Sequence, residues 1–142
     1  MASIHPQLER DSFILGKFPL CHLLLSRDSR YPWFILVPDR DNITEIYQLN
    51  EADRLQLLKE SCQLSEALYT GFNAEKLNIA ALGNIVPQLH IHHIVRYGND
   101  PAWPAPVWGK LAAKHYGEAE LNTLQMKIQK MNFTDFQFFG ET

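Results

Sequence analysis

Short apolar runs, separated by polar or proline-containing segments, dominate the first part of the chain. Apolar residues fill most of 12–17 and 20–25, and the polar group at 26–30 ends the second run. A third run, 33–37, is continuously apolar between two prolines, which indicates a strand buried on both faces. We therefore expect a hairpin followed by a third strand.

A long helix is expected from Glu51 to about Gly71. Asn50 is a favourable N-cap residue, and Glu51 and Asp53 suit the positive end of the helix dipole. Gly71 is a natural stop. Two apolar rows run along this helix and lie well apart around it, so we expect it to bury two sides. They are Leu55, Leu58 and Cys62 in one row, and Leu57, Leu64 and Leu68 in the other.

The sequence predicts two further strands and one further helix in the second half of the chain. Apolar patterns at 77–82 and 88–97 indicate a fourth and a fifth strand, and a proline- and tryptophan-rich segment follows at 98–109. A last helix is expected at 118–131, and four phenylalanines in 132–142 indicate a terminus that docks on the protein. This order predicts an α+β fold, with a mostly antiparallel five-stranded sheet and two main helices.

Composition narrows the class of protein. With 142 residues, 46% of them hydrophobic, the chain suits a single domain over 1–142. A net charge of −3 gives no basic surplus for binding a nucleic-acid polymer, and no run suits a membrane span or a signal peptide. Cys21 and Cys62 each lie among leucines and are expected to be buried free thiols. We therefore expect a cytoplasmic protein.

The candidate chemistry is concentrated in the segment QLHIHHIV at 88–95. Because side chains alternate along a strand, Gln88, His90 and His92 are expected to share one face, and His93 to join the aliphatic core face. By the same parity Arg96 lies with His90, where it can attract phosphate or form a solvated strand end. The remaining histidines are interpreted as inert. They are His5, His22 and His115.

This segment resembles the motif of the histidine-triad (HIT) family, His-φ-His-φ-His-φ-φ, in which φ is apolar. Gln88 takes the first triad position, His90 the second and His92 the third. The resemblance extends to the pair Gly83-Asn84, to the strand that ends in Val37-Pro38, and to the tryptophan–proline segment 103–109, which resembles a bacterial branch of the family with a Gln-φ-His-φ-His-His motif. It covers about 8–110 as a core, which leaves 111–142 for the last helix and the apolar tail.

The resemblance implies both a function and a set of site residues. His90 corresponds to the nucleophile, which attacks the α-phosphorus of a nucleoside phosphoramidate or dinucleoside polyphosphate and forms a nucleotidyl-histidine. His92 then donates a hydrogen bond to the phosphate or the leaving atom. Neither a cofactor nor a metal is expected. The remaining substrate-binding candidates are Gln88 and Asn84 near phosphate, Trp33 at the base in place of a usual histidine, and Ser26 or Asp28 at the ribose.

Two other functions remain open on the sequence. Gln88 cannot titrate, so the domain can be a nucleotide-binding module with little turnover. A His-x-His pair on a strand is also typical of metal sites, although the next acid after His92 is Asp100, beyond the expected strand. We further expect a homodimer, because the second apolar row of the long helix needs a cover, unless the phenylalanine-rich tail supplies it.

Overall fold

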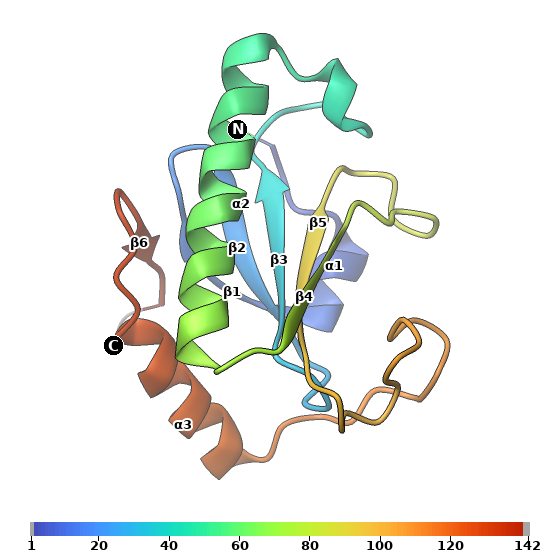
Figure 1. Cartoon of the computed structure of the whole chain (residues 1–142). Coiled ribbons are helices and arrows are strands. Elements are labelled where there is room, and N and C mark those ends of the chain that lie inside the picture. The colour runs from blue at the N-terminus through green and yellow to red at the C-terminus, as the bar shows by residue number, and fades with distance from the viewer. Residues whose placement is uncertain (1, 141–142) are drawn as a thin grey trace.

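The computed structural model describes residues 2–140, which contain a six-stranded antiparallel sheet with helices on both faces (Figure 1). The sheet order is β4-β5-β3-β2-β1-β6. The strands are β1 (Ser12–Lys17), β2 (Cys21–Ser26), β3 (Trp33–Pro38), β4 (Lys76–Ala80), β5 (Ile91–Arg96) and β6 (Gln137–Phe138). The α+β class is confirmed, and the sheet has one more strand than the five expected because the tail adds β6.

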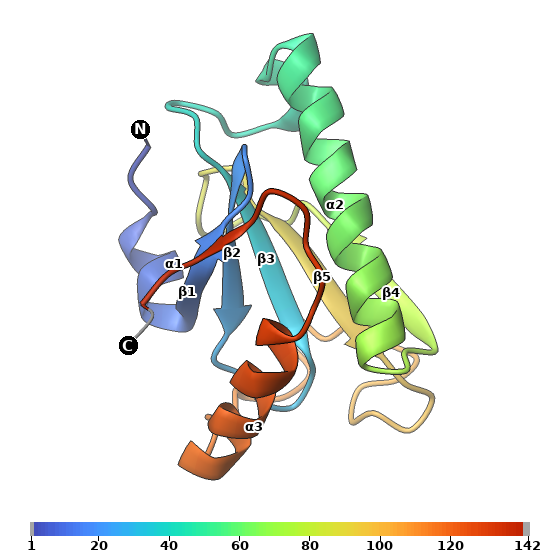
Figure 2. The ribbon, with the colours of Figure 1, turned by 90° about the vertical axis from the view of Figure 1, so that its left-hand side faces the viewer.

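The helices are α1 (Pro6–Asp11), the 3₁₀ helix η1 (Ile46–Gln48), α2 (Glu51–Gly71) and α3 (Glu118–Gln129). Figure 2 shows α1 and α2 on opposite sides of the sheet. The predicted N-cap of α2 is confirmed, because the side chain of Asn50 accepts a hydrogen bond from the Asp53 N–H at 2.8 Å. The short helix α1 was not predicted. Its start is capped by His5, whose Nδ1 accepts from the Gln7 N–H at 3.0 Å.

The strand at 33–37 is buried on both faces, as its continuous apolar run predicted. Phe34 and Leu36 belong to the main core beneath α2, whereas Ile35 and Val37 belong to a second cluster with Leu8 of α1. We call these two sides of the sheet the α2 face and the α1 face. The continuous run therefore reflects a sheet covered on both sides.

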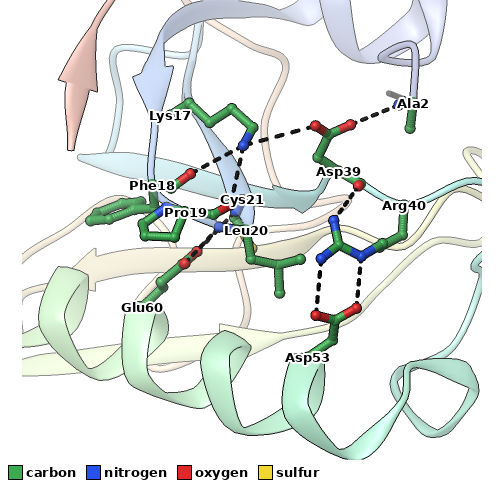
Figure 3. A network of polar contacts seen from close by, with 10 residues as sticks. All are labelled: Ala2, Lys17, Phe18, Pro19, Leu20, Cys21, Asp39, Arg40, Asp53 and Glu60. Carbon is green, nitrogen blue, oxygen red and sulfur yellow. Dashed lines mark hydrogen bonds and ion pairs between the residues drawn. The ribbon is translucent and has the colours of Figure 1, made fainter. Parts of the chain in front are cut away.

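Polar contacts fix α2 against the start of β2 (Figure 3). The buried carboxylate of Glu60 accepts from the N–H groups of Leu20 and Cys21, at 2.8 and 2.9 Å. About two turns earlier in the helix, Asp53 accepts two hydrogen bonds of 2.7 and 3.0 Å from Arg40, which follows β3. Because a buried carboxylate is costly without partners, these contacts specify where the helix lies on the sheet.

Only one of the two apolar rows of α2 is buried within the chain. Leu57, Leu64 and Leu68 pack into the core, whereas Leu55 and Leu58 are 64% and 61% exposed. Cys62 is also exposed, so the expectation of two buried thiols is correct for Cys21 and wrong for Cys62. No helix among residues 2–140 is both long enough and apolar enough to span a bilayer.

The C-terminal tail docks as predicted, but at the β1 edge of the sheet. The rings of Phe133 and Phe136 lie 5.2 and 4.6 Å from the ring of Phe18, and β6 pairs with β1. Any side chain at Gly16 would overlap the Gln137 carbonyl, so glycine permits this close approach. Within the described chain the tail leaves Leu55 exposed, so it is not the cover of the second apolar row.

Candidate active site

His90 and His92 lie side by side on the α1 face, where the chain enters β5. Their ring centroids are 4.9 Å apart, and both side chains are buried. Nδ1 of His90 lies 2.7 Å from the carbonyl oxygen of Gln88. Because a carbonyl can only accept, Nδ1 carries the ring proton, and Nε2 of the neutral imidazole is left with a free electron pair. His90 therefore has the protonation pattern of a nucleophile.

Burial keeps both imidazoles neutral near pH 7. Loss of solvation lowers the pKa of His90, although the hydrogen bond to Gln88 opposes that shift. Burial and then the neighbouring His90 lower the pKa of His92 to about 4. Desolvation disfavours the charged form of a histidine, and a second ring close by adds to that effect. The site thus presents a neutral nucleophile beside a neutral hydrogen-bond donor.

Trp33 orients His92. The indole Nε1–H donates to Nδ1 of His92 at 2.9 Å, so the proton of His92 resides on Nε2. The acceptor found for that N–H is the Leu82 carbonyl at 3.4 Å, a long separation that leaves the donor available to a ligand. The sequence predicted Trp33 as part of a base pocket. The ring does line the cavity, but its N–H is committed to His92.

Both histidines line a cavity of about 610 Å³ on the α1 face. That volume lies within the range of cavities that hold small molecules. Leu8, Ile35 and Val86 provide an apolar wall. The cavity also has a polar side, formed in part by Arg10, Asp11, Arg27 and His115. It can therefore hold a ligand that has both an apolar ring and anionic groups.

Three predicted ligand-binding residues reach this cavity. Asn84, Ser26 and Asp28 all line it. Asp28 is partly engaged, because its Oδ1 accepts from the N–H groups of Arg30 and Lys114 at 3.0 and 3.2 Å. His115, which was interpreted as inert, lines the same cavity. Its backbone forms an isolated bridge with Asp28, a long-range pairing that no local pattern indicates.

Gln88 does not join the two histidines in the cavity. Its Oε1 accepts from the His5 N–H at 2.8 Å and its Nε2 donates to the Ser3 carbonyl at 2.9 Å. It lines a neighbouring cavity of about 340 Å³ instead. The predicted alternation fails there because Gln88 lies at a bend, three residues before β5 begins at Ile91. Gln88 is therefore placed to hold the segment that leads into α1.

Trp108 lines the cavity, although the sequence offered no specific role for it. Its ring lies edge-on to His92 at 5.1 Å and to Trp33 at 5.7 Å, and it lines the cavity. The loop that carries it is held by Arg96, which forms an ion pair with Asp100 at 2.8 Å and is 1% exposed. Both interpretations of Arg96, as a phosphate ligand and as a solvated strand end, are thus wrong.

The turn before the triad segment requires a glycine at position 83. A Cβ there would lie 2.7 Å from the Val86 carbonyl oxygen and 3.5 Å from Cε1 of His90. The first contact is too close to persist, so a larger residue would force the turn to shift. Gly83 therefore lets the backbone close tightly beside His90.

The side chains around His90 and His92 do not form a set of ligands suited to a metal ion. Within residues 2–140 no group of three or more His, Cys, Asp or Glu side chains is arranged to hold an ion. Asp100, the acid considered for that role, is engaged by Arg96. His90 and His92 each have Nδ1 committed to a partner, Gln88 and Trp33 respectively.

Comparisons with a family model and with solved structures both give matches to this chain. The family model described as "HIT domain" matches residues 7–99. A histidine-triad protein from Marinobacter aquaeolei VT8 is 48% identical, with 91% of this chain and 94% of that chain covered and a TM-score of 0.88. Histidine-triad proteins from Sinorhizobium meliloti 1021 (42% identity, 92% and 96% covered) and Bradyrhizobium japonicum (40%, 91% and 96%) also give TM-scores of 0.88. No curated protein matches the chain.

Proposed function

The chain belongs to the HIT family, and from that membership and the cavity we propose that it hydrolyses or transfers nucleotides at the α-phosphate through a nucleotidyl-histidine intermediate. The observation that carries the proposal is the hydrogen bond from Nδ1 of His90 to the Gln88 carbonyl, which leaves Nε2 unprotonated. A neutral imidazole with a free nitrogen is a competent nucleophile near pH 7.

The first chemical step is attack by His90 on phosphorus. Its Nε2 electron pair forms the N–P bond, while the bond from phosphorus to the leaving atom breaks. The charge that His90 gains is shared through Nδ1–H with the Gln88 carbonyl, 2.7 Å away. The Nε2–H of His92 donates to the phosphoryl or leaving oxygen, where negative charge develops.

The second step returns the enzyme to its starting state. Water, or another acceptor in a transferase, attacks phosphorus from the side that the leaving group vacated, and the N–P electron pair returns to His90. The nucleoside is held by the rest of the cavity in this proposal. The apolar wall that includes Ile35 takes the base, Asp28 or Ser26 takes the ribose, and Asn84 takes a phosphate oxygen.

Activity with purified protein tests this function. A panel should include adenosine phosphoramidates, dinucleoside polyphosphates and nucleoside-diphosphate sugars, with His90→Gly as control. Turnover that depends on His90 supports the proposal. Tight nucleotide binding with no turnover would favour the binding module instead, and activity lost on chelation and restored by zinc would favour a metal hydrolase.

We also propose that the chain is a single cytoplasmic domain that pairs as a homodimer. The exposed row of α2, formed by Leu55, Leu58 and Cys62, offers an apolar surface that a two-fold partner would cover. Sedimentation should give a dimer for the wild type and a monomer for the double variant Leu55→Glu, Leu58→Glu. Lys59→Glu on the same helix is the matched control. A monomeric wild type at micromolar concentration would reject the dimer.

A further inference from the structure

The hydrogen bond between Trp33 and His92 determines which protons His92 can give. An indole N–H is a donor only, so Nδ1 of His92, 2.9 Å away, must be an acceptor without a proton. The single ring proton then lies on Nε2. His92 therefore offers one N–H as a hydrogen-bond donor and holds no second proton that it could transfer to a leaving group.

The groups around His92 disfavour a second proton on its ring. Protonated Nδ1 would face the indole N–H, which sets two donors against each other. The ring is 6% exposed, with His90 at 4.9 Å and the edge of Trp108 at 5.1 Å. His93, next along β5, faces the opposite side, and burial lowers its pKa to about 4. None of the ion pairs found among residues 2–140 involves His92.

Other ionisable groups around the cavity belong to other elements. They are His90 before β5, Arg10 and Asp11 on α1, Arg27 and Asp28 after β2, and His115 before α3. Within residues 2–140, the hydrogen bonds of His92 reach only Trp33 and the Leu82 carbonyl. A proton for a leaving group would therefore have to come from across the cavity, where His115 is the histidine that lines it.

We propose that Trp33 is a positioning residue that sets leaving-group specificity. By holding His92 as a neutral Nε2–H donor, it favours phosphate esters and anhydrides, whose leaving groups depart as oxyanions, over phosphoramidates. This inference rests on the proposed function, because it concerns the leaving group that His90 displaces.

The electron balance of the first step explains the preference. When Nε2 of His90 bonds to phosphorus, the electron pair of the broken bond departs with the leaving group. A phosphate or phenolate oxygen keeps that pair as a stable anion, hydrogen-bonded to Nε2–H of His92. An amine nitrogen must gain a proton to depart, and neutral His92 cannot supply one without becoming an imidazolate. Proton transfer by a positioned acid typically contributes a factor of 10² to 10⁴.

Matched substrates with one nucleoside test this preference. The pair comprises an adenosine 5′-phosphate anhydride with phenyl phosphate and an adenosine 5′-phosphoramidate of benzylamine. For wild type we expect kcat/KM on the anhydride to exceed that on the phosphoramidate by about a hundredfold or more. An equal or higher kcat/KM on the phosphoramidate would overturn the inference, as would phosphoramidate turnover that His115→Ala removes.

Variants of Trp33 give a second test of the leaving-group preference. Trp33→Phe keeps an aromatic ring without the donor, and Trp33→His places a ring nitrogen there that can accept a hydrogen bond from a protonated Nδ1 of His92. Both should raise the phosphoramidate-to-anhydride ratio by about tenfold or more, because His92 can then be protonated. Trp103→Phe, at the half-exposed tryptophan outside the cavity, should leave the ratio unchanged. A ratio that does not move in either Trp33 variant would overturn the inference.

A readout without turnover separates this inference from the proposed function. Nitrogen-15 NMR of His92 should show protonated Nε2 and bare Nδ1 in wild type, and a mixture of tautomers with a raised pKa in Trp33→Phe. Unchanged nitrogen shifts in Trp33→Phe would reject the role of Trp33 even if His90 is the nucleophile. Conversely, wild-type rates in His90→Gly would reject the proposed function, whatever the NMR shows.

Discussion

His90 and His93 are anchored in the same way but face different surroundings. Nδ1 of each lies close to the carbonyl two residues earlier, Gln88 at 2.7 Å and Ile91 at 3.1 Å. Nε2 of His93 is satisfied by the hydroxyl of Ser61 at 2.7 Å on the α2 face. Among the described residues Nε2 of His90 has no such partner, and its ring lines the cavity.

The two rings differ in the one feature that distinguishes a candidate catalytic histidine from a histidine of the core. The residue type and the backbone contact are shared, so neither identifies a nucleophile. What differs is whether the second nitrogen is paired inside the protein or left open to a ligand. Four changes test this comparison.

The largest expected effect is loss of turnover in His90→Gly. Removal of a nucleophile that forms a covalent intermediate should lower kcat by about 10⁴-fold or more, with nucleotide affinity largely kept. Steady-state kinetics and equilibrium dialysis measure the two quantities. A His90→Gly enzyme with substantial activity, after contamination is excluded, would remove the basis for the comparison.

His92→Ala should have a smaller effect. It removes the Nε2–H donor that Trp33 holds in place but leaves His90 and its Gln88 contact intact. Loss of one donor to a developing charge typically costs on the order of a hundredfold in kcat. If kcat instead fell as far as in His90→Gly, His92 would have a role beyond donating a hydrogen bond.

His93→Gln should change stability rather than chemistry. The wild-type ring is fully buried, with a pKa lowered by burial from 6.5 to about 4. His93 therefore binds a proton more readily in the unfolded chain than in the folded one. The contribution of the neutral ring to the free energy of unfolding is complete above pH 6.5 and is lost as pH falls toward 4. At about 1.4 kcal/mol per pKa unit the loss is about 3 kcal/mol.

Urea unfolding at several pH values measures that loss. The glutamine variant should be less stable at pH 7 by about 1 to 3 kcal/mol, because Ser61 loses its ring partner. Its free energy of unfolding should also decline less steeply between pH 6.5 and 4 than that of the wild type. Its kcat should stay within about tenfold of the wild-type value. The same acid slope in both proteins would show that His93 titrates normally.

The smallest effect is expected for Gln88→Ala. The change frees the Ser3 carbonyl and the His5 N–H near the surface, where water can replace the amide, so the cost should be about 1 kcal/mol. Hydrogen exchange should quicken in α1, and KM should rise more than kcat falls. Gln88→Glu, which keeps only the acceptor, is the matched control. A collapse of kcat would instead place Gln88 in the chemistry.

The local pattern of β5 was enough to separate His90 and His92 from His93, because alternation along a strand is a backbone property. The same rule failed for Gln88, because it lies at a bend three residues before the strand, and nothing in the sequence marks that bend. The long helix α2 and its N-cap were also predictable, because Asn50 acts on its own neighbours, accepting from the Asp53 N–H.

Contacts between distant segments could not be predicted. The Trp33–His92 hydrogen bond depends on the pairing of β3 with β5, two strands that α2 and β4 separate in the chain. The bridge between Asp28 and His115 is likewise a contact across the fold. Apolar content predicted that the phenylalanine tail docks, but its place beside Gly16 depends on shape that composition does not encode.

The most direct test of the central claim is to locate the covalent nucleotide. Wild-type protein is mixed with a turned-over substrate and quenched rapidly in alkali, in which N–P bonds survive, and its peptides are analysed by mass spectrometry. We predict a nucleoside monophosphoryl group on His90 and none on His93, and no adduct in His90→Gly. An adduct on another residue, or rapid turnover with no adduct at any quench time, would contradict it.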